Sequence, residues 1–315
     1  MTSPAGPAAG VHLPWARVPE RVRAWATEVG GGSPTSIRDV SGGFSPGATS
    51  VLDCPGRSIF VKAVGAELNP DSPAFHRREV RVSAALSAVP CAPRLLSTYD
   101  DADWVALAFE VVDGRPPLHP WDSTELEAVV QSLAQLHREC TPCPVPGLDS
   151  LVTRAASLFG GWAELAGSDP PAAIDEWAVV NLSRLADLES GWPAACGGDT
   201  LLHGDLRADN VLIGPHGVVF VDWPHASVGN PAFDIVAWAP SVVLEGGPAP
   251  DELLAAYDPS ETLNPEDVTV LLAAIAGFFV AHSLHPAPPG LPTLRSFQQA
   301  QGDVALTWLR RRTGW

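Results

Sequence analysis

Apolar residues recur with two different periods, and the change of period divides the chain. In roughly the first third, short apolar runs are separated by polar or glycine-rich turns, a pattern typical of strands. Within this part, residues 75–86 instead carry apolar positions at helical spacing, which predicts one main helix. The predicted strands are 37–40, 50–52, 58–64, 94–99 and 104–112.

Helical spacing dominates the rest of the chain. Leu126, Val129 and Leu133 begin one such series, and Thr124 with Glu127 forms the expected capping box at its start. His137, at the end of this helix, is expected to be a packing residue. The apolar run 268–281 is too short for a membrane span and predicts a buried helix that begins at Asn264-Pro265. Other helices are predicted over 18–29, 151–166, 171–189 and 294–312.

The order of these elements predicts an α+β protein with a small antiparallel sheet followed by a larger, mostly helical part. Residues 1–14 are rich in Pro, Gly and Ala and are expected to form a loose tail. The connection Asp113-Gly114-Arg115-Pro116-Pro117 is punctuated by Gly and Pro. We therefore expect an N-terminal lobe over 15–113 and a C-terminal lobe over 114–315.

Charge and cysteine content narrow the classes of function. A net charge of −17 argues against a general binder of nucleic acid or of anionic membranes, since both need basic patches. A cationic small substrate is compatible with it, although a solvated acidic surface is the commoner cause. Five scattered cysteines and an N-terminus without signal-peptide features favour a reduced, cytoplasmic protein. No obligate protein partner is evident.

The stretch His203-Gly204-Asp205-Leu206-Arg207-Ala208-Asp209-Asn210 carries the strongest chemical signal. Its first carboxylate, Asp205, can orient an attacking hydroxyl and take its proton, and Asn210 offers an amide oxygen five positions later. The following apolar run 218–221 delivers Asp222, a second hard oxygen ligand of the kind that Mg²⁺ prefers. This spacing is that of a kinase catalytic loop.

Lys62 adds a phosphate-binding candidate. It is the only lysine among 19 basic residues, and it lies in a predicted strand. A compact ammonium suits a phosphate site. On the predicted helix 75–86, Glu79 shares a face with Val82 and Leu86, so its carboxylate can reach Lys62 while that face is buried.

Together with His203 and with Asp234 in Gly229-Asn230-Pro231-Ala232-Phe233-Asp234, this pattern resembles the aminoglycoside phosphotransferase family. The resemblance implies a two-lobed protein-kinase-like fold, with the N-terminal lobe binding nucleotide and the C-terminal lobe carrying catalysis and substrate binding. It also implies that Glu79 is the ion-pair partner of Lys62. By the same resemblance Asp234 anchors the catalytic loop, which His203 braces.

The nucleotide contacts implied by the resemblance fall on two further segments. A glycine-rich turn containing Ser41, Gly42 and Gly43 would cover the phosphates of ATP. The backbone of Glu110 and Val112 would contact the adenine edge at a hinge between the lobes.

The function expected from the resemblance is transfer of the γ-phosphoryl group of ATP, with Mg²⁺, to a hydroxyl of a small molecule. Only eleven residues separate Asp222 from Asp234, which leaves no room for the peptide-docking segment of a protein kinase. The acidic residues of 242–266 would suit an aminoglycoside or another amino-substituted antibiotic, and hence antibiotic resistance. The alternatives are a kinase of a sugar or small alcohol metabolite, and a catalytically silent nucleotide-binding module that regulates a partner.

Overall fold

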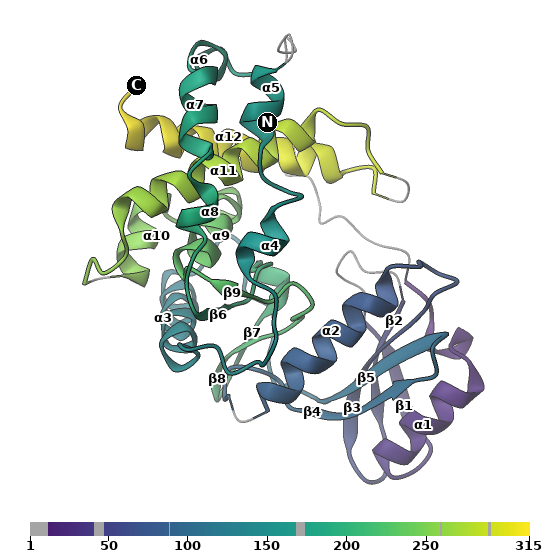
Figure 1. Ribbon diagram of the computed structural model, residues 1–315. Coiled ribbons are helices and arrows are strands. Elements are labelled where there is room, and N and C mark those ends of the chain that lie inside the picture. The colour runs from purple at the N-terminus through teal and green to yellow at the C-terminus, as the bar shows by residue number, and fades with distance from the viewer. Residues whose placement is uncertain (1–11, 41–46, 88, 168–173, 259, 289–290) are drawn as a thin grey trace. The chain divides into compact units, whose positions relative to one another are not determined.

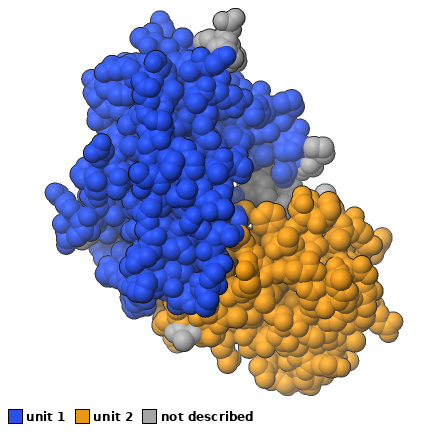
Figure 2. Space-filling model, viewed as in Figure 1, with its two compact units in different colours: residues 1–5, 117–208, 226–315 blue, residues 6–116, 209–225 orange. Residues whose placement is uncertain are grey.

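The chain folds into two compact units, each made of separate segments (Figure 2). Unit 2 contains residues 6–116 and 209–225, and unit 1 contains residues 117–208 and 226–315. The structure, a computed structural model, describes residues 12–40, 47–87, 89–167, 174–258, 260–288 and 291–315.

Unit 2 is built on a five-stranded antiparallel sheet with the strand order β1-β2-β3-β5-β4 (Figure 1). Sheet and helices together confirm the predicted α+β class. The elements are the short helix η1 (Trp15–Arg17), α1 (Glu20–Gly30), β1 (Ser36–Asp39), β2 (Ala48–Asp53), β3 (Ser58–Gly65), α2 (Ser72–Ala85), β4 (Leu95–Asp100) and β5 (Trp104–Glu110).

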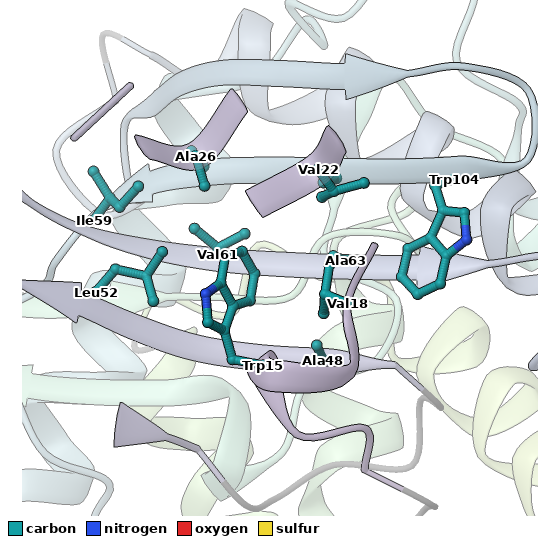
Figure 3. Packing of buried hydrophobic residues seen from close by; sticks show 12 residues of the cluster. Trp15, Val18, Val22, Ala26, Ala48, Leu52, Ile59, Val61, Ala63 and Trp104 are labelled. Carbon is teal, nitrogen blue, oxygen red and sulfur yellow. The ribbon is translucent and has the colours of Figure 1, made fainter. Parts of the chain in front are cut away.

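The two faces of this sheet are covered by different helices. On one face, Trp15 of η1 and Val22 of α1 pack with Ile59 and Val61 of β3 (Figure 3). On the other, Val105, Leu107 and Phe109 of β5 pack with Val80 of α2. Because neighbouring residues in a strand point to opposite faces, Lys62 points to the side of the sheet that α2 covers.

A small hairpin completes unit 2. Strands β7 (Val211–Gly214) and β8 (Gly217–Phe220) pair antiparallel, with Val211 opposite Phe220. The turn is tight, and Gly217 has a φ of 117°, which glycine adopts without steric cost. The N–H of Phe220 donates to the carbonyl of Cys91 at 2.8 Å, so the hairpin is joined to the N-terminal part of the unit.

Unit 1 is mostly helical and contains one further two-stranded antiparallel pair, β6 with β9. At its centre lies α11, which packs against α12 and α9. The elements are α3 (Ser123–Glu139), α4 (Leu151–Ala155), α5 (Gly161–Ala166), α6 (Glu176–Val180), α7 (Leu182–Glu189), α8 (Trp192–Ala195), β6 (Thr200–Leu202), β9 (Ser227–Gly229), α9 (Ala232–Leu244), α10 (Pro250–Tyr257), α11 (Pro265–Ser283) and α12 (Leu294–Thr313).

Helix α11 alone among the described residues is long and apolar enough to cross a membrane. Most of its apolar window is buried inside the protein, which is the pattern of a core helix. Its start is the predicted one, since the Asn264 side chain accepts the N–H of Glu266 at 2.9 Å. Trp162 packs closely on Gly277 and donates its indole N–H to the carbonyl of Ala273 at 2.8 Å.

Three local predictions are wrong. The capping box at Thr124 does not form, because Asp122 caps α3 instead and accepts the N–H groups of Thr124 and Glu125, both at 3.0 Å. The helix predicted over 151–166 is broken into α4 and α5, and the one predicted over 171–189 is divided at Asn181 into α6 and α7.

The break between α4 and α5 has an identifiable cause. Gly160 adopts a φ of 111°, and the buried carboxylate of Glu189 accepts the N–H groups of Gly160, Trp162 and Ala163 at 3.0 to 3.2 Å. A new helix therefore starts at Gly161, because the N–H groups of its first turn, which have no partner within the helix, donate to a side chain from α7.

Candidate active site

Lys62 lies between two carboxylates within unit 2. Its Nζ is 2.8 Å from Oε1 of Glu79 and 2.6 Å from Oδ1 of Asp222. Strand β3 and helix α2 bring Lys62 and Glu79 together, since α2 packs on the sheet face to which Lys62 points. Asp222 comes from the end of the hairpin, 160 residues away in sequence. Three elements thus converge on one ammonium group.

Burial governs the electrostatics of this triad. The Lys62 side chain is 14% exposed and that of Glu79 is 2% exposed. Burial alone would lower the pKa of Lys62, but the charges of Asp222 and Glu79 outweigh it and hold that pKa above its ordinary value. Burial raises the pKa of Glu79, and Lys62 opposes that rise. Lys62 is therefore a permanently charged cation at neutral pH.

The hairpin brings Asn210 and Asp222 to adjoining positions. Asn210 ends the short helix η2 (Ala208–Asn210) immediately before β7, and Asp222 follows β8. The N–H of Val221 donates to the backbone carbonyl of Asn210 at 2.9 Å, which closes the hairpin at this end. Asp222 has a φ of 69°, a left-handed conformation that Asp tolerates better than most residues.

The donor set fits a hard divalent cation. Asn210 and Asp222 both offer oxygen, the ligand type that Mg²⁺ prefers, and a Mg²⁺ site needs few protein ligands when phosphates complete it. Among the described residues, no group of three or more His, Cys, Asp and Glu side chains could hold a metal ion without such help. Oε2 of Glu79 is buried without a hydrogen-bond partner, so this carboxylate has one oxygen that the ion pair with Lys62 does not use.

Asp205 lies in unit 1, in the loop that follows β6. The two preceding residues are held by the buried carboxylate of Asp234, which accepts the N–H of His203 at 2.7 Å and that of Gly204 at 2.9 Å. Gly204 has a φ of 80°, so the chain turns sharply immediately before Asp205. The N–H of Asp205 lies 3.4 Å from Nδ1 of His203, a buried side chain.

The Asp234 carboxylate is ionised in this setting. Burial by itself would raise its pKa, but the hydrogen bonds that it receives from His137 and from the N–H of Gly204 bring the pKa below its ordinary value. Nε2 of His137 lies 3.1 Å from Oδ2 of Asp234. A buried anion that receives several donors is a rigid anchor for the loop backbone.

The predicted nucleotide contacts lie on two further segments, of which the structure describes only the one at the end of β5. Ser41, Gly42 and Gly43 lie outside the described residues. Glu110 ends β5; its carboxylate lies 3.4 Å from Nε of Arg94, and its N–H donates to the backbone carbonyl of Arg94 at 3.0 Å, so this N–H is already engaged. Val112 follows β5 in the sequence. The next residues, Asp113, Gly114 and Arg115, line a shallow hollow of about 460 Å³ together with Ile213, Gly214 and Pro215.

Sequence reasoning assigned no polar contact to three buried residues, His137 and Tyr257 in unit 1 and His76 in unit 2. His137, which helical spacing marks as a packing residue, is hydrogen bonded at both ring nitrogens, to Asp234 and to Tyr257. His76 of α2 is buried near the triad, and burial together with the charge of Lys62 lowers its pKa to about 4. The one sequence signal for the burial of His76 near the triad is its position three residues before Glu79, on the same face of the helix.

Comparison with known proteins gives one family. The family model of the phosphotransferase enzyme family APH matches residues 36–298. No curated protein sequence matches the chain.

Solved structures of small-molecule kinases share the fold. The choline kinase LicA from Streptococcus pneumoniae has a TM-score of 0.59 at 14% identity, covering 94% of this chain and 97% of that one. A thermostable mutant of the aminoglycoside phosphotransferase APH(4)-Ia, in a ternary complex with AMP-PNP and hygromycin B, has a TM-score of 0.59 at 14% identity, covering 93% and 98%.

A third structure, the spectinomycin phosphotransferase APH(9)-Ia with ADP and spectinomycin, has a TM-score of 0.56 at 13% identity and covers 87% of this chain and 93% of that one. Identities this low establish the fold alone, whereas the family model spans most of the sequence. The chain therefore belongs to the phosphotransferase enzyme family APH.

Proposed function

We propose that the protein transfers the γ-phosphoryl group of Mg-ATP to a hydroxyl of a small molecule. The observation that carries the proposal is the triad of Lys62, Glu79 and Asp222, in which a charged lysine is held between a buried carboxylate and a second, partly exposed one. Two of the solved structures with this fold contain AMP-PNP or ADP, which supports an adenine nucleotide as donor.

The roles of the residues follow from the needs of phosphoryl transfer. Lys62 binds the phosphates of the nucleotide, and Glu79 keeps its ammonium in place. Asn210 and Asp222 would hold Mg²⁺, which would supply positive charge to the phosphate oxygens. Ser41, Gly42 and Gly43 would cover the phosphates, and the backbone of Glu110 and Val112 would contact the adenine. On this assignment unit 2 binds the nucleotide.

Unit 1 supplies the group that handles the proton. Asp205 orients the acceptor hydroxyl, whose oxygen forms a bond to the γ-phosphorus while the bond from that phosphorus to the bridging oxygen breaks. The hydroxyl proton passes to the carboxylate of Asp205 as the new bond forms. Asp234 fixes the backbone immediately before Asp205, and His203 braces the same loop.

The charge of the acceptor is the open part of the proposal. In the acidic segment 242–266, the carboxylate of Glu245 accepts the indole N–H of Trp121 at 3.0 Å, and that of Asp251 accepts the indole N–H of Trp308 at 2.7 Å. Asp258 accepts the N–H of Leu263 at 2.7 Å. These three acids are engaged in the fold, and the segment therefore offers a cationic acceptor fewer carboxylates than its composition suggests.

An aminoglycoside acceptor remains one form of the proposal, supported by the hygromycin B and spectinomycin complexes of proteins with this fold. A sugar or choline-like alcohol is the other form, supported by the choline kinase. We further infer a cytoplasmic protein, since ATP is the donor and all five cysteines are free thiols.

The test is ADP release by the purified protein with Mg-ATP, screened against aminoglycosides, other cationic antibiotics, amino sugars and small alcohols. Turnover on one acceptor that is lost in Asp205→Ala supports the proposal and names the acceptor class. Mg-ATP binding without turnover on any acceptor favours a silent regulatory module. Absence of nucleotide binding refutes the proposal.

A further inference from the structure

A chain of buried polar groups joins helix α10 to the catalytic loop within unit 1. The hydroxyl of Tyr257, the last residue of α10, lies 2.6 Å from Nδ1 of His137 in α3. Nε2 of His137 lies 3.1 Å from Oδ2 of Asp234, which in turn accepts the N–H of His203. Tyr257 is 8% exposed, and His137 and Asp234 are more deeply buried.

The two ends of this chain of polar groups limit where its protons can lie. Burial, with the charges of Asp234 and Asp258, raises the pKa of Tyr257, so the hydroxyl keeps its proton. Asp234 is an anion that only accepts. With the hydroxyl of Tyr257 as donor to Nδ1 of His137, the Nε2–H of His137 is the group that donates to Asp234.

This direction of donation makes Tyr257 the residue that selects the tautomer of His137. With the hydroxyl present, Nδ1 is the acceptor and Nε2 carries the hydrogen that Asp234 needs. Without it, Nδ1 is a buried nitrogen with no donor from α10, and the alternative tautomer would face Asp234 with a lone pair. The orientation of Asp234, and with it the backbone of His203 and Gly204, depends on that choice.

We propose that Tyr257 is a positioning residue for Asp205, acting through His137 and Asp234. The inference rests on the proposed function insofar as it assigns catalysis to Asp205. The ordering of the loop by Tyr257 is a property of unit 1 that can be measured without any substrate. Figure 1 shows α10, α3 and α9, from which Tyr257, His137 and Asp234 come, and β6, after which the catalytic loop begins.

The chain offers a matched control for the variant Tyr257→Phe. Ser241 of α9 is also buried in unit 1, and its hydroxyl accepts from Nε2 of Gln301 at 2.6 Å. Ser241→Ala therefore removes a single buried hydroxyl with a hydrogen bond of the same length. None of the contacts given above links Ser241 to the catalytic loop.

The first measurement is amide hydrogen exchange in the segment 201–206. We expect exchange at His203 and Gly204 to become about tenfold faster in Tyr257→Phe, since the anchor that protects these amides is loosened, and to stay unchanged in Ser241→Ala. Equal exchange rates in the two variants would overturn the proposal. Because this measurement needs no turnover, its outcome is independent of whether the protein is a phosphotransferase.

The second measurement is steady-state kinetics with the acceptor found in the ADP-release screen. Tyr257→Phe is expected to lower kcat about tenfold while the KM for ATP changes less than twofold, because only the loop that carries Asp205 is displaced. Ser241→Ala should leave both constants unchanged. If kcat falls in neither variant, Tyr257 does not position Asp205, even if it orders the loop.

A measurement on the wild-type protein covers the case in which Tyr257→Phe does not fold. Nitrogen-15 chemical shifts of the His137 imidazole distinguish a protonated from an unprotonated ring nitrogen. We expect an unprotonated Nδ1 and a protonated Nε2. A proton on Nδ1 would reverse the direction of donation and overturn the inference.

Discussion

Nζ of Lys62 lies closer to Asp222, at 2.6 Å, than to Glu79, at 2.8 Å, although Glu79 is the more deeply buried of the two carboxylates. The lysine thus compensates a carboxylate that water barely reaches. Removal of Lys62 would leave Glu79 buried beside a second negative charge. We expect Lys62→Ala to lower the free energy of unfolding by about 3–5 kcal/mol, the usual cost of stranding one partner of a buried ion pair.

Chemical denaturation of a double-mutant cycle measures this effect. The double variant Lys62→Met with Glu79→Met removes both buried charges and should be more stable than Lys62→Met alone, despite losing more native groups. A double variant that is less stable than the single one would show that the pair itself, and not the stranded charge, accounts for the loss.

His76 predicts a pH dependence of stability. In the folded protein, burial and Lys62 lower its pKa from 6.5 to about 4, whereas the unfolded chain keeps the ordinary value. Between these two values the unfolded state binds more protons, so the free energy of unfolding falls as the pH is lowered from 6.5 towards 4. At 1.36 kcal/mol per pKa unit the total loss is roughly 3 kcal/mol.

The measurement is the difference in free energy of unfolding between the wild type and His76→Gln as the pH is lowered from neutrality to about pH 5. The wild type should lose more stability than the variant over this interval, because the variant has no imidazole to protonate. Nearby Lys62 and Asp222 are present in both proteins. Parallel curves for the two proteins would contradict the assigned pKa shift.

Asp205 and Asp209 are carboxylates four positions apart, Asp205 in the loop after β6 and Asp209 in η2. Asp205→Asn should lower kcat by about 10²–10⁴-fold, the usual contribution of a group that takes a proton, with little change in the KM for ATP. Asp209 is exposed, and Asp209→Asn should leave kcat within twofold of the wild type. Steady-state ADP release checks both, and a large loss in Asp209→Asn would reassign the base.

Phe297 predicts a small contribution to the stability of unit 1. Its ring lies 5.9 Å from the guanidinium of Arg207, which is two residues after Asp205, so α12 approaches the catalytic loop within unit 1. Phe297→Ala should lower the free energy of unfolding by about 1 kcal/mol, because such a contact at a partly exposed site is worth about 0.5–1 kcal/mol. Chemical denaturation of the variant and the wild type checks this, and equal stability of the two would contradict it.

Local patterns predict much of the fold because they report burial directly. The alternation of β3 fixes which side of the strand Lys62 occupies, and the helical spacing of α2 fixes that Glu79 faces the sheet. The cap of α11 at Asn264 is equally local, since donor and acceptor are two residues apart.

What the sequence does not predict depends on groups that are distant along the chain. The break before α5 requires the carboxylate of Glu189, which is 27 residues from Trp162, and no periodicity reports such a contact. The bond from Tyr257 to His137 spans 120 residues. Helical spacing marks His137 as a packing residue, because burial looks the same whether a ring nitrogen is satisfied or not.

The segment 209–225 has a consequence for the order in which the protein forms during synthesis. It belongs to unit 2, and it carries Asn210 and Asp222, yet it emerges from the ribosome after all of the helices α3 to α8 of unit 1. The sheet and α2 can assemble early, but Lys62 then lacks Asp222 and Glu79 lacks the N–H of Trp223. The nucleotide-binding half of the proposed enzyme is therefore completed late in translation, when its last strand pair arrives.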